Sequence, residues 1–294
     1  MKNEQTIKRG AGCTAPVGPA GFAGRILAGA VGLLLISAVF GGRAWAITGG
    51  EPDNGRHPNV GAVIAYYPPV GIIPMASGTL VHERVFLTAG HVVDLIQSGV
   101  VTLLGVSFEQ ELNLEKPKTW LEVSDLVGSF TGADASPNST DIGAIILKDP
   151  VKSLAPAPLP AAGFLDGLKQ AGQLQSGPDG TRFTVVGYGW VVDWPPPQPD
   201  EWENRTRNVT QPGYLGLNDG WLHLAQNVAA GYGGIARGDS GGPTFWTDPQ
   251  TGDEVLVSIT SWGAPTWIAM GVSYRIDTET SLQFIQDVID GLEE

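Results

Sequence analysis

The stretch GDSGGP, residues 238–243, decides how this chain of 294 residues is expected to fold. It places a serine, Ser240, among three glycines, an aspartate and a proline. Glycine permits sharp turns and lets the backbone approach a ligand closely, because it carries no Cβ atom. The stretch alone therefore predicts a tight turn around Ser240, with room for a ligand beside the backbone.

Short runs typical of β-strands lie on both sides of this turn, between clusters of Gly, Pro, Asn and Asp. Many short strands separated by turn residues are typical of a sandwich or a barrel. The clearest runs are residues 59–67, 77–81, 85–89, 142–147, 183–186, 254–262 and 270–276.

The tail of the chain has a different pattern, which predicts a helix. A polar cluster at residues 277–281 can cap the first turn of such a helix. The apolar residues that follow it at helical spacing are Leu282, Ile285, Val288, Ile289 and Leu292.

The first 46 residues have the pattern of an export signal. A basic leader precedes an apolar run at 26–40, and AWA at 44–46 has the small-x-small form of a cleavage site. We expect cleavage after Ala46, which makes the mature protein secreted or periplasmic and free of the membrane. The alternative is an uncleaved membrane anchor, although the run is short of the ~20 apolar residues that a span needs. The only cysteine, Cys13, lies in this leader, so the mature chain has no disulfide.

Composition argues against several classes of protein. Acidic residues number 30 against 17 basic ones, and because binding to phosphates needs a basic face we expect no nucleic-acid partner. Hydrophobic residues make up 42% of the chain, and it has neither Gly triplets nor sustained heptads, which argues against collagen, coiled coils and disorder. We expect a globular monomer.

Further motifs occur on both sides of GDSGGP, and together they resemble the chymotrypsin/trypsin-like serine peptidase family. The match runs from residue 47 to about residue 290. GDSGGP is its specific part, and each other motif is weak by itself. In the order of the family, these are ITGG (47–50), SGTLVHERVFLTAGH (77–91), DIGAIIL (141–147), GYG (187–189), SWG (261–263) and GVSYRI (271–276).

The resemblance implies an all-β fold class: two packed antiparallel β-barrels of chymotrypsin-like type with a C-terminal α-helix. Residues 1–46 would be the signal peptide and residues 47–294 the peptidase domain. The first barrel would cover about residues 47–165 and the second about residues 166–276.

The resemblance also assigns a catalytic triad. A serine hydroxyl is a poor nucleophile and needs an adjacent base, so Ser240 would attack while His91 acts as general base and then as acid to the leaving amine. Asp141 would orient His91 and stabilise its imidazolium form. Without GDSGGP, His91 reads as an ordinary histidine at a strand end and Asp141 as a turn residue; with it, we predict the triad.

Negative charge develops on the substrate carbonyl oxygen during the reaction and needs hydrogen-bond donors. The resemblance assigns this oxyanion hole to the backbone N–H groups of Gly238 and Ser240. A side chain at position 238 would crowd the hole, although glycine also suits a plain turn there.

In relatives, the aspartate that matches Asp239 pairs with the free α-ammonium of the first mature residue, and this pair forms the oxyanion hole and the pocket. The matching first residue here is Ile47, which directly follows Ala46. We therefore hypothesise that signal peptidase itself releases the active amino terminus.

The primary pocket is assigned in the same way. Gly234, six residues before Ser240, would lie at its base with Ile235 next to it, so no carboxylate is present to pair with Arg or Lys. Gly263 and Gly271 match positions whose small size leaves the pocket walls open. The resemblance therefore implies cleavage after apolar residues of medium to large size.

Residues near this pocket would hold the rest of the substrate. Ser261, Trp262 and Gly263 would bind the substrate backbone as an added strand, the usual way in which an extended peptide docks on a sheet edge. Arg237, at the pocket mouth, either favours acidic neighbours in the substrate or is a solvated loop residue. The expected partners are protein or peptide substrates.

The chain departs from the family at two half-cystine positions, Val92 and Ala236. Each missing bridge forfeits ~2–4 kcal/mol of stability, but the chemistry uses no sulfur. The other histidines, His57, His82 and His223, show no metal-ligand spacing, so we expect no metal and no cofactor.

Two functions from different classes compete. The first is an exported serine endopeptidase that forms an acyl-enzyme and prefers apolar residues before the scissile bond. The second is a catalytically silent scaffold that acts as a binding or adhesion protein. The presence of all three triad residues favours the enzyme.

Overall fold

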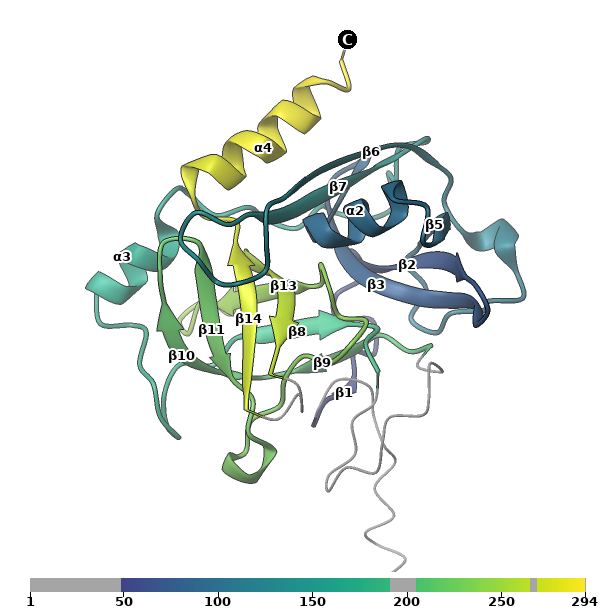
Figure 1. Cartoon of the computed structure of the whole chain (residues 1–294). Coiled ribbons are helices and arrows are strands. Elements are labelled where there is room, and N and C mark those ends of the chain that lie inside the picture. Colours follow the sequence, from purple (N-terminus) through teal and green to yellow (C-terminus); the bar gives the residue numbers. More distant parts are fainter. Residues whose placement is uncertain (1–48, 191–204, 265–268, 294) are drawn as a thin grey trace, which may run out of the picture. The chain divides into compact units, whose positions relative to one another are not determined.

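The computed structural model describes residues 49–190, 205–264 and 269–293, and strands dominate these residues (Figure 1). Six strands form one antiparallel sheet in the order β5-β2-β3-β4-β7-β6. Their bounds are β2 (Val60–Tyr67), β3 (Gly71–His82), β4 (Val85–Thr88), β5 (Thr102–Ser107), β6 (Val123–Phe130) and β7 (Asp141–Leu147).

Eight strands form a second antiparallel sheet in the order β1-β9-β8-β12-β13-β14-β11-β10. Each predicted run overlaps a strand in one of the two sheets. The bounds in the second sheet are β1 (Glu51–Pro52), β8 (Thr184–Gly187), β9 (Asn208–Thr210), β10 (Gly213–Leu217), β11 (Trp221–Ala225), β12 (Pro243–Thr247), β13 (Glu254–Gly263) and β14 (Met270–Arg275).

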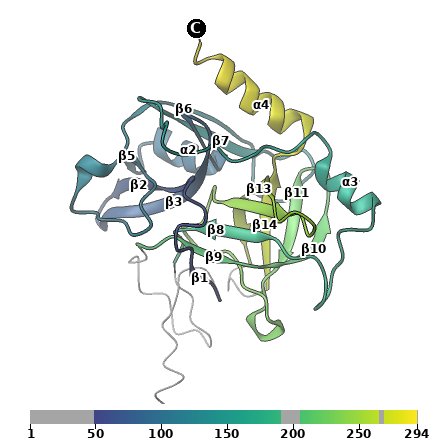
Figure 2. The same cartoon turned by 180° about the vertical axis from the view of Figure 1, so that it is seen from behind.

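The described chain begins with the short strand β1, which pairs with only one of the two sheets. It lies beside β9 (Figure 2) and therefore belongs to the second sheet. Glu51 is opposite Val209, and Pro52 is opposite Asn208. The chain then enters the first sheet at β2. β2 to β7 form the first sheet, and β8 to β14 complete the second. The division near residue 165 stays a prediction.

Helices occupy few of the described residues: α2 (Gly90–Gln97), α3 (Phe164–Gln170) and α4 (Glu279–Asp290), with 3-10 turns at Pro117–Thr119 and Val228–Ala230. The predicted C-terminal helix is present as α4. Its N-cap is Thr278, whose side chain accepts the N–H of Ser281, as expected for the polar cluster. Two curled antiparallel sheets, or half-barrels, and a C-terminal helix confirm the predicted fold class.

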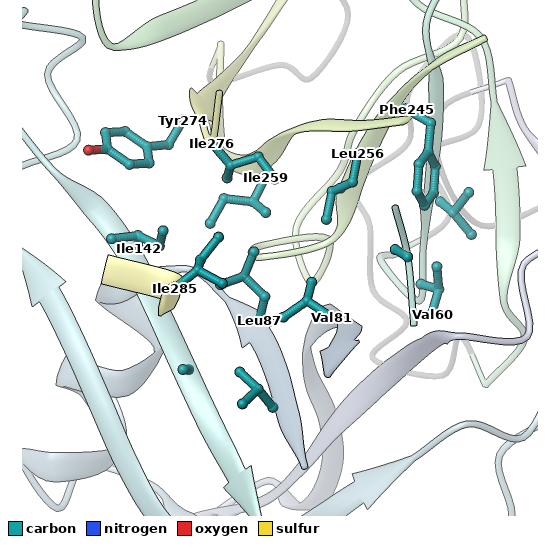
Figure 3. Packing of buried hydrophobic residues seen from close by; sticks show 14 of the residues in the cluster. Val60, Val81, Leu87, Ile142, Phe245, Leu256, Ile259, Tyr274, Ile276 and Ile285 are labelled. Atoms are coloured by element: carbon teal, nitrogen blue, oxygen red, sulfur yellow. The ribbon is translucent and has the colours of Figure 1, made fainter. Parts of the chain in front are cut away.

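The largest apolar core lies between the sheets rather than inside one of them (Figure 3). Leu87 and Ile142 enter it from the first sheet, Phe245 and Ile259 from the second, and Ile285 from α4. All five side chains are almost completely buried. The two sheets and the last helix therefore share one core.

Candidate active site

His91 lies at the start of α2, where the chain leaves β4. The residue before it, Gly90, allows this approach. A Cβ atom at Gly90 would lie 2.4 Å from the Ser129 carbonyl oxygen and 2.9 Å from the backbone nitrogen of Ile142. The helix can therefore sit against β6 and β7 only because residue 90 has no side chain, and this brings His91 to the start of β7.

Asp141, the first residue of β7, holds the His91 ring. The backbone N–H of His91 donates to Asp141 Oδ1 at 2.8 Å, and His91 Nδ1 lies 2.9 Å from Asp141 Oδ2. The hydroxyl of Ser261, in β13, donates to the same Oδ2 atom. Asp141 is completely buried, whereas the His91 side chain is 28% exposed. A buried carboxylate with these donors fixes the ring and leaves Nε2 as the nitrogen that Asp141 does not engage.

Ser240 lies on a loop that packs against the end of β4. Its carbonyl accepts the N–H of Ser77 at 2.9 Å. The next residue, Gly241, has a left-handed φ of +78°, and a Cβ atom there would lie 2.1 Å from Thr88 Oγ1. Thr88 is three residues before His91, so the loop contacts the chain close to the histidine in sequence. The Ser240 hydroxyl has no hydrogen-bond partner in the described residues, so its bond to His91 stays a prediction.

Gly238 also has a left-handed conformation, with φ of +93°. Its carbonyl accepts the Ser77 hydroxyl at 3.0 Å, which ties the loop to β3. The N–H groups of Gly238 and Ser240 donate to no partner within the described part of the chain. Unengaged N–H groups are what an oxyanion hole requires.

Asp239 is completely buried between these two residues. It accepts the N–H of Gly189 at 2.7 Å and that of Ala236 at 2.8 Å. Burial raises its pKa to about 7, and the two N–H groups lower it only in part. Ile47, its expected partner, lies outside the described residues.

The GYG motif makes room for this carboxyl group. A Cβ atom at Gly187 would lie 2.2 Å from Asp239 Oδ1, and one at Gly189 would lie 2.3 Å from Asp239 Cγ. A side chain at either position would therefore collide with the Asp239 carboxyl group. Between them, the backbone N–H of Tyr188 donates to the Ser77 hydroxyl at 2.9 Å, which links the motif to β3.

The residues assigned to the primary pocket lie around a side chain that sequence reasoning missed. Gly263 pairs with Gly271 across β13 and β14. Gln226, directly after β11, is completely buried and lies against Gly234 and Gly271. No local sequence pattern marks Gln226, because the contacts come from two distant segments.

Two other predicted residues are also placed. Ile235 is buried in an apolar cluster of the second sheet with Leu224 and Val257. The guanidinium of Arg237 lies 5.1 Å from the centre of the Trp190 ring. Arg237 is therefore held against an aromatic ring, which fixes its charge near the loop of Gly238.

A second group missed from the sequence is a buried ionic cluster away from His91. His57 lies between Asp53 and Glu254, with Nε2 at 2.9 Å from the glutamate, and Arg207 Nε donates to Asp53 at 3.0 Å. Burial by itself lowers the pKa of His57, but its two carboxylate partners outweigh burial and raise it to about 9. Burial likewise raises the pKa of Asp53, and the bonds from His57 and Arg207 outweigh it and lower that pKa to about 2.

In a comparison with known proteins, a family model described as Trypsin matches residues 49–280. The chain belongs to the trypsin family. A crystal structure of the scabies mite inactivated protease paralogue S-I1 is similar to it, with a TM-score of 0.57 and 21% identity over 82% of this chain and 99% of that chain. At this identity the likeness shows the fold. No curated protein matches the sequence.

The described residues of this trypsin-family chain form neither a metal site nor a membrane-spanning helix. Within residues 49–190, 205–264 and 269–293, no three His, Cys, Asp or Glu side chains are grouped so that they could hold a metal ion. In the same residues, no helix has the length and apolar character needed to cross a membrane.

Proposed function

We propose that this trypsin-family chain is a serine endopeptidase that hydrolyses peptide bonds through Ser240, His91 and Asp141. The observation that supports it best is the pair formed by Asp141 and His91. The buried carboxylate accepts both the backbone and the ring N–H of His91, so the ring is held in one tautomer. Nε2 is then the basic nitrogen, which is the state that a general base for Ser240 needs.

The acylation step follows from these roles. Nε2 of His91 takes the hydroxyl proton as Ser240 Oγ bonds to the substrate carbonyl carbon, and the N–H groups of Gly238 and Ser240 receive the oxyanion. His91 then protonates the leaving amine as the peptide bond breaks. Water repeats the sequence on the acyl-enzyme, releasing the acid and restoring Ser240.

We also propose that the α-ammonium of Ile47 pairs with Asp239. The burial of Asp239 supports this, because none of the described residues gives its carboxyl group an opposite charge and burial raises its pKa to about 7. Residues 1–46 would act as a signal peptide, and cleavage after Ala46 would deliver the enzyme outside the cytoplasm. Amino-terminal sequencing of the exported protein tests both, since a start upstream of Ile47 contradicts them.

The proposed substrates are proteins and peptides cleaved after uncharged, apolar residues. Gly234 supplies no carboxylate at the pocket base, and Ile235 next to it is buried. A preference for Arg or Lys therefore has no charge partner there. Ser261, Trp262 and Gly263 belong to β13 and are the proposed partners of the substrate backbone.

A sulfonyl fluoride separates the enzyme from the silent scaffold. We expect stoichiometric labelling of Ser240, located by mass spectrometry, together with cleavage of a denatured protein mixture. Ser240→Ala abolishes both, whereas the surface control Ser176→Ala leaves both unchanged, because Ser176 is exposed and is none of the residues assigned to the site. A folded protein that is neither labelled nor active would instead be the silent binding protein.

A further inference from the structure

The proposed primary pocket contains a side chain from outside the expected set. Gln226 follows β11 and is completely buried. A Cβ atom at Gly234 would lie 2.1 Å from Gln226 Cβ and 2.4 Å from its Oε1. A Cβ atom at Gly271 would lie 2.7 Å from the same Oε1. The space that these two glycines leave open is therefore filled by Gln226.

Two hydrogen bonds hold Gln226 in this place. Its Oε1 accepts the N–H of Ile235 at 3.1 Å, which also settles which end of the carboxamide is the oxygen. Its backbone N–H donates to the Ala269 carbonyl at 3.2 Å. The side chain is therefore fixed by the segment that leads to Ser240, and the backbone by the segment that leads into β14.

A second side chain narrows the same space. The ideal Cβ position of Gly271 lies 3.1 Å from Ile235 Cγ1 and 3.2 Å from Ile235 Cδ1. Gln226 and Ile235 thus meet at Gly271, which the family resemblance places in the pocket wall. Glycines at positions 234 and 271 would by themselves predict a deep pocket. The side chains of Gln226 and Ile235 fill this space and make the pocket shallow.

We propose that Gln226 forms the floor of the primary pocket and restricts the residue before the scissile bond to short, uncharged side chains such as alanine, serine or valine. This inference rests on the proposed function. It replaces the preference expected from the sequence, which was for apolar residues of medium to large size.

The chemistry of Gln226 suggests how to isolate its volume. Its Nε2 is buried without a hydrogen-bond partner among the described residues, so the carboxamide is fixed through Oε1. Gln226→Ala and Gln226→Met both remove that acceptor from the Ile235 N–H. They differ in volume, because methionine nearly conserves the size of glutamine and alanine does not. Any difference between the two variants therefore measures the filling of the pocket.

The first experiment compares kcat/KM for matched peptides with Phe or Ala before the scissile bond. Gln226→Ala is expected to raise the Phe/Ala ratio by more than about tenfold, since a single methylene in an apolar pocket changes it by roughly 10–200-fold. Gln226→Met is expected to keep the ratio of the unmodified enzyme. If Gln226→Ala does not fold, Gln226→Asn takes its place, with a smaller rise.

The second experiment does not depend on catalysis. Binding of indole, measured by NMR, is expected for Gln226→Ala and not for the unmodified protein or Gln226→Met. The pocket floor is contradicted if the unmodified enzyme cleaves after Phe as fast as after Ala, or if indole binds all three proteins equally. Sulfonyl fluoride labelling of Ser240 keeps the two hypotheses apart, because labelling with an unchanged Phe/Ala ratio overturns only the role of Gln226. If Ser240 is not labelled, the proposed peptidase activity is contradicted. Indole binding then still tests whether Gln226 forms the floor of the pocket.

Discussion

Asp239 is a completely buried carboxyl group whose only hydrogen-bond partners in the described residues are two backbone N–H groups. Burial raises its pKa to about 7. A positive charge next to it lowers that pKa, because an opposite charge favours the ionised form. The protonation of Asp239 therefore reports whether the ammonium of Ile47 has docked.

Blocking the amino group of Ile47, by acetylation or by an added Met, is expected to make the stability of the fold depend on pH. The unfolded carboxyl titrates near 3.8 and the folded one near 7. The folded state therefore keeps the Asp239 proton to a higher pH than the unfolded state does. The free energy of unfolding is highest below pH 3.8 and falls as the pH rises toward and through about 7. The loss is on the order of 4 kcal/mol. Urea unfolding across this range measures it.

Asp239→Asn is the control for this effect, because it removes the titrating group. In that variant the blocked protein is expected to show no such slope. The same slope in the free and the blocked forms would mean that Ile47 does not pair with Asp239.

Gly189→Ala tests the fit of the GYG motif around the same carboxyl group. The new Cβ atom would lie 2.3 Å from Asp239 Cγ, so the loop must shift. We expect a loss of about 1–3 kcal/mol of stability, as for other overpacked sites. Displacing the Gly238 N–H should also lower kcat by roughly 10²–10³-fold. Thermal unfolding and peptide hydrolysis measure the two effects.

Gly167→Ala is the matched substitution in α3, where a Cβ atom meets nothing within 4 Å. It is expected to stabilise the protein by about 0.5–1 kcal/mol, because glycine inside a helix costs conformational entropy. Equal effects at positions 167 and 189 would show that the Asp239 contact does not constrain the motif.

At the scale of elements, α4 is the clearest case of local sequence and tertiary contact acting together. Thr278 caps its first turn through the N–H of Ser281. Ile285 and Val288 are on the buried face and join the core between the sheets. The helix packs against β7, the strand that carries Asp141. The C-terminal helix therefore supports a strand of the proposed site.

Ile285→Ala should destabilise the fold by about 2–5 kcal/mol, because it leaves a cavity in the core that both sheets share. Thr278→Ala should cost about 1 kcal/mol through the lost cap. Gln283→Ala, on the exposed face, should change stability by less than about 0.5 kcal/mol. Denaturant unfolding of the three variants ranks them, and an equal effect of Ile285→Ala and Gln283→Ala would mean that α4 is not docked.

At the scale of the whole molecule, a buried arginine links the two sheets. Arg207, just before β9, bonds Asp53 and also donates from Nη1 to the carbonyls of Val60 at 3.0 Å and Phe108 at 3.1 Å. His57 extends the cluster to Glu254 in β13. Because removing one member of a buried charged group leaves its partners uncompensated, this cluster is expected to be costly to break.

The charge of His57 should therefore set an upper pH limit on stability. Its folded pKa of about 9 exceeds the unfolded 6.5, so its contribution is complete below 6.5 and is lost as pH rises through 9. The difference corresponds to roughly 3 kcal/mol. Subtracting the stability curve of His57→Phe from that of the unmodified protein should isolate this slope.

His223→Gln is the control with the opposite sign. Burial lowers the pKa of His223 below 6.5, so its contribution increases as pH rises through that range. The two substitutions should thus change the pH slope in opposite directions. A His57→Phe variant that keeps the slope of the unmodified protein would show that the imidazolium does not hold the cluster together.

Local sequence patterns predicted part of the fold. The alternation of short runs with turn residues predicted a sandwich or a barrel, and the helical spacing of the tail predicted a terminal helix. The two packed barrels were predicted only through the family resemblance. Two of the strands that were missed carry weak patterns. β9 has only three residues, and β6 is a sheet edge on which polar and apolar residues do not alternate clearly.

The triad residues His91, Asp141 and Ser240 were also chosen from the sequence, through the family resemblance, and their catalytic roles remain predictions. Only the tertiary structure showed that Ser261 bonds Asp141, that Gln226 fills the space beside Gly234, and that His57 lies between two carboxylates. Each of these contacts joins segments that are distant in the sequence or depends on which way a side chain turns. Propensity and spacing describe one segment at a time, whereas burial and charge partners arise only when segments pack together.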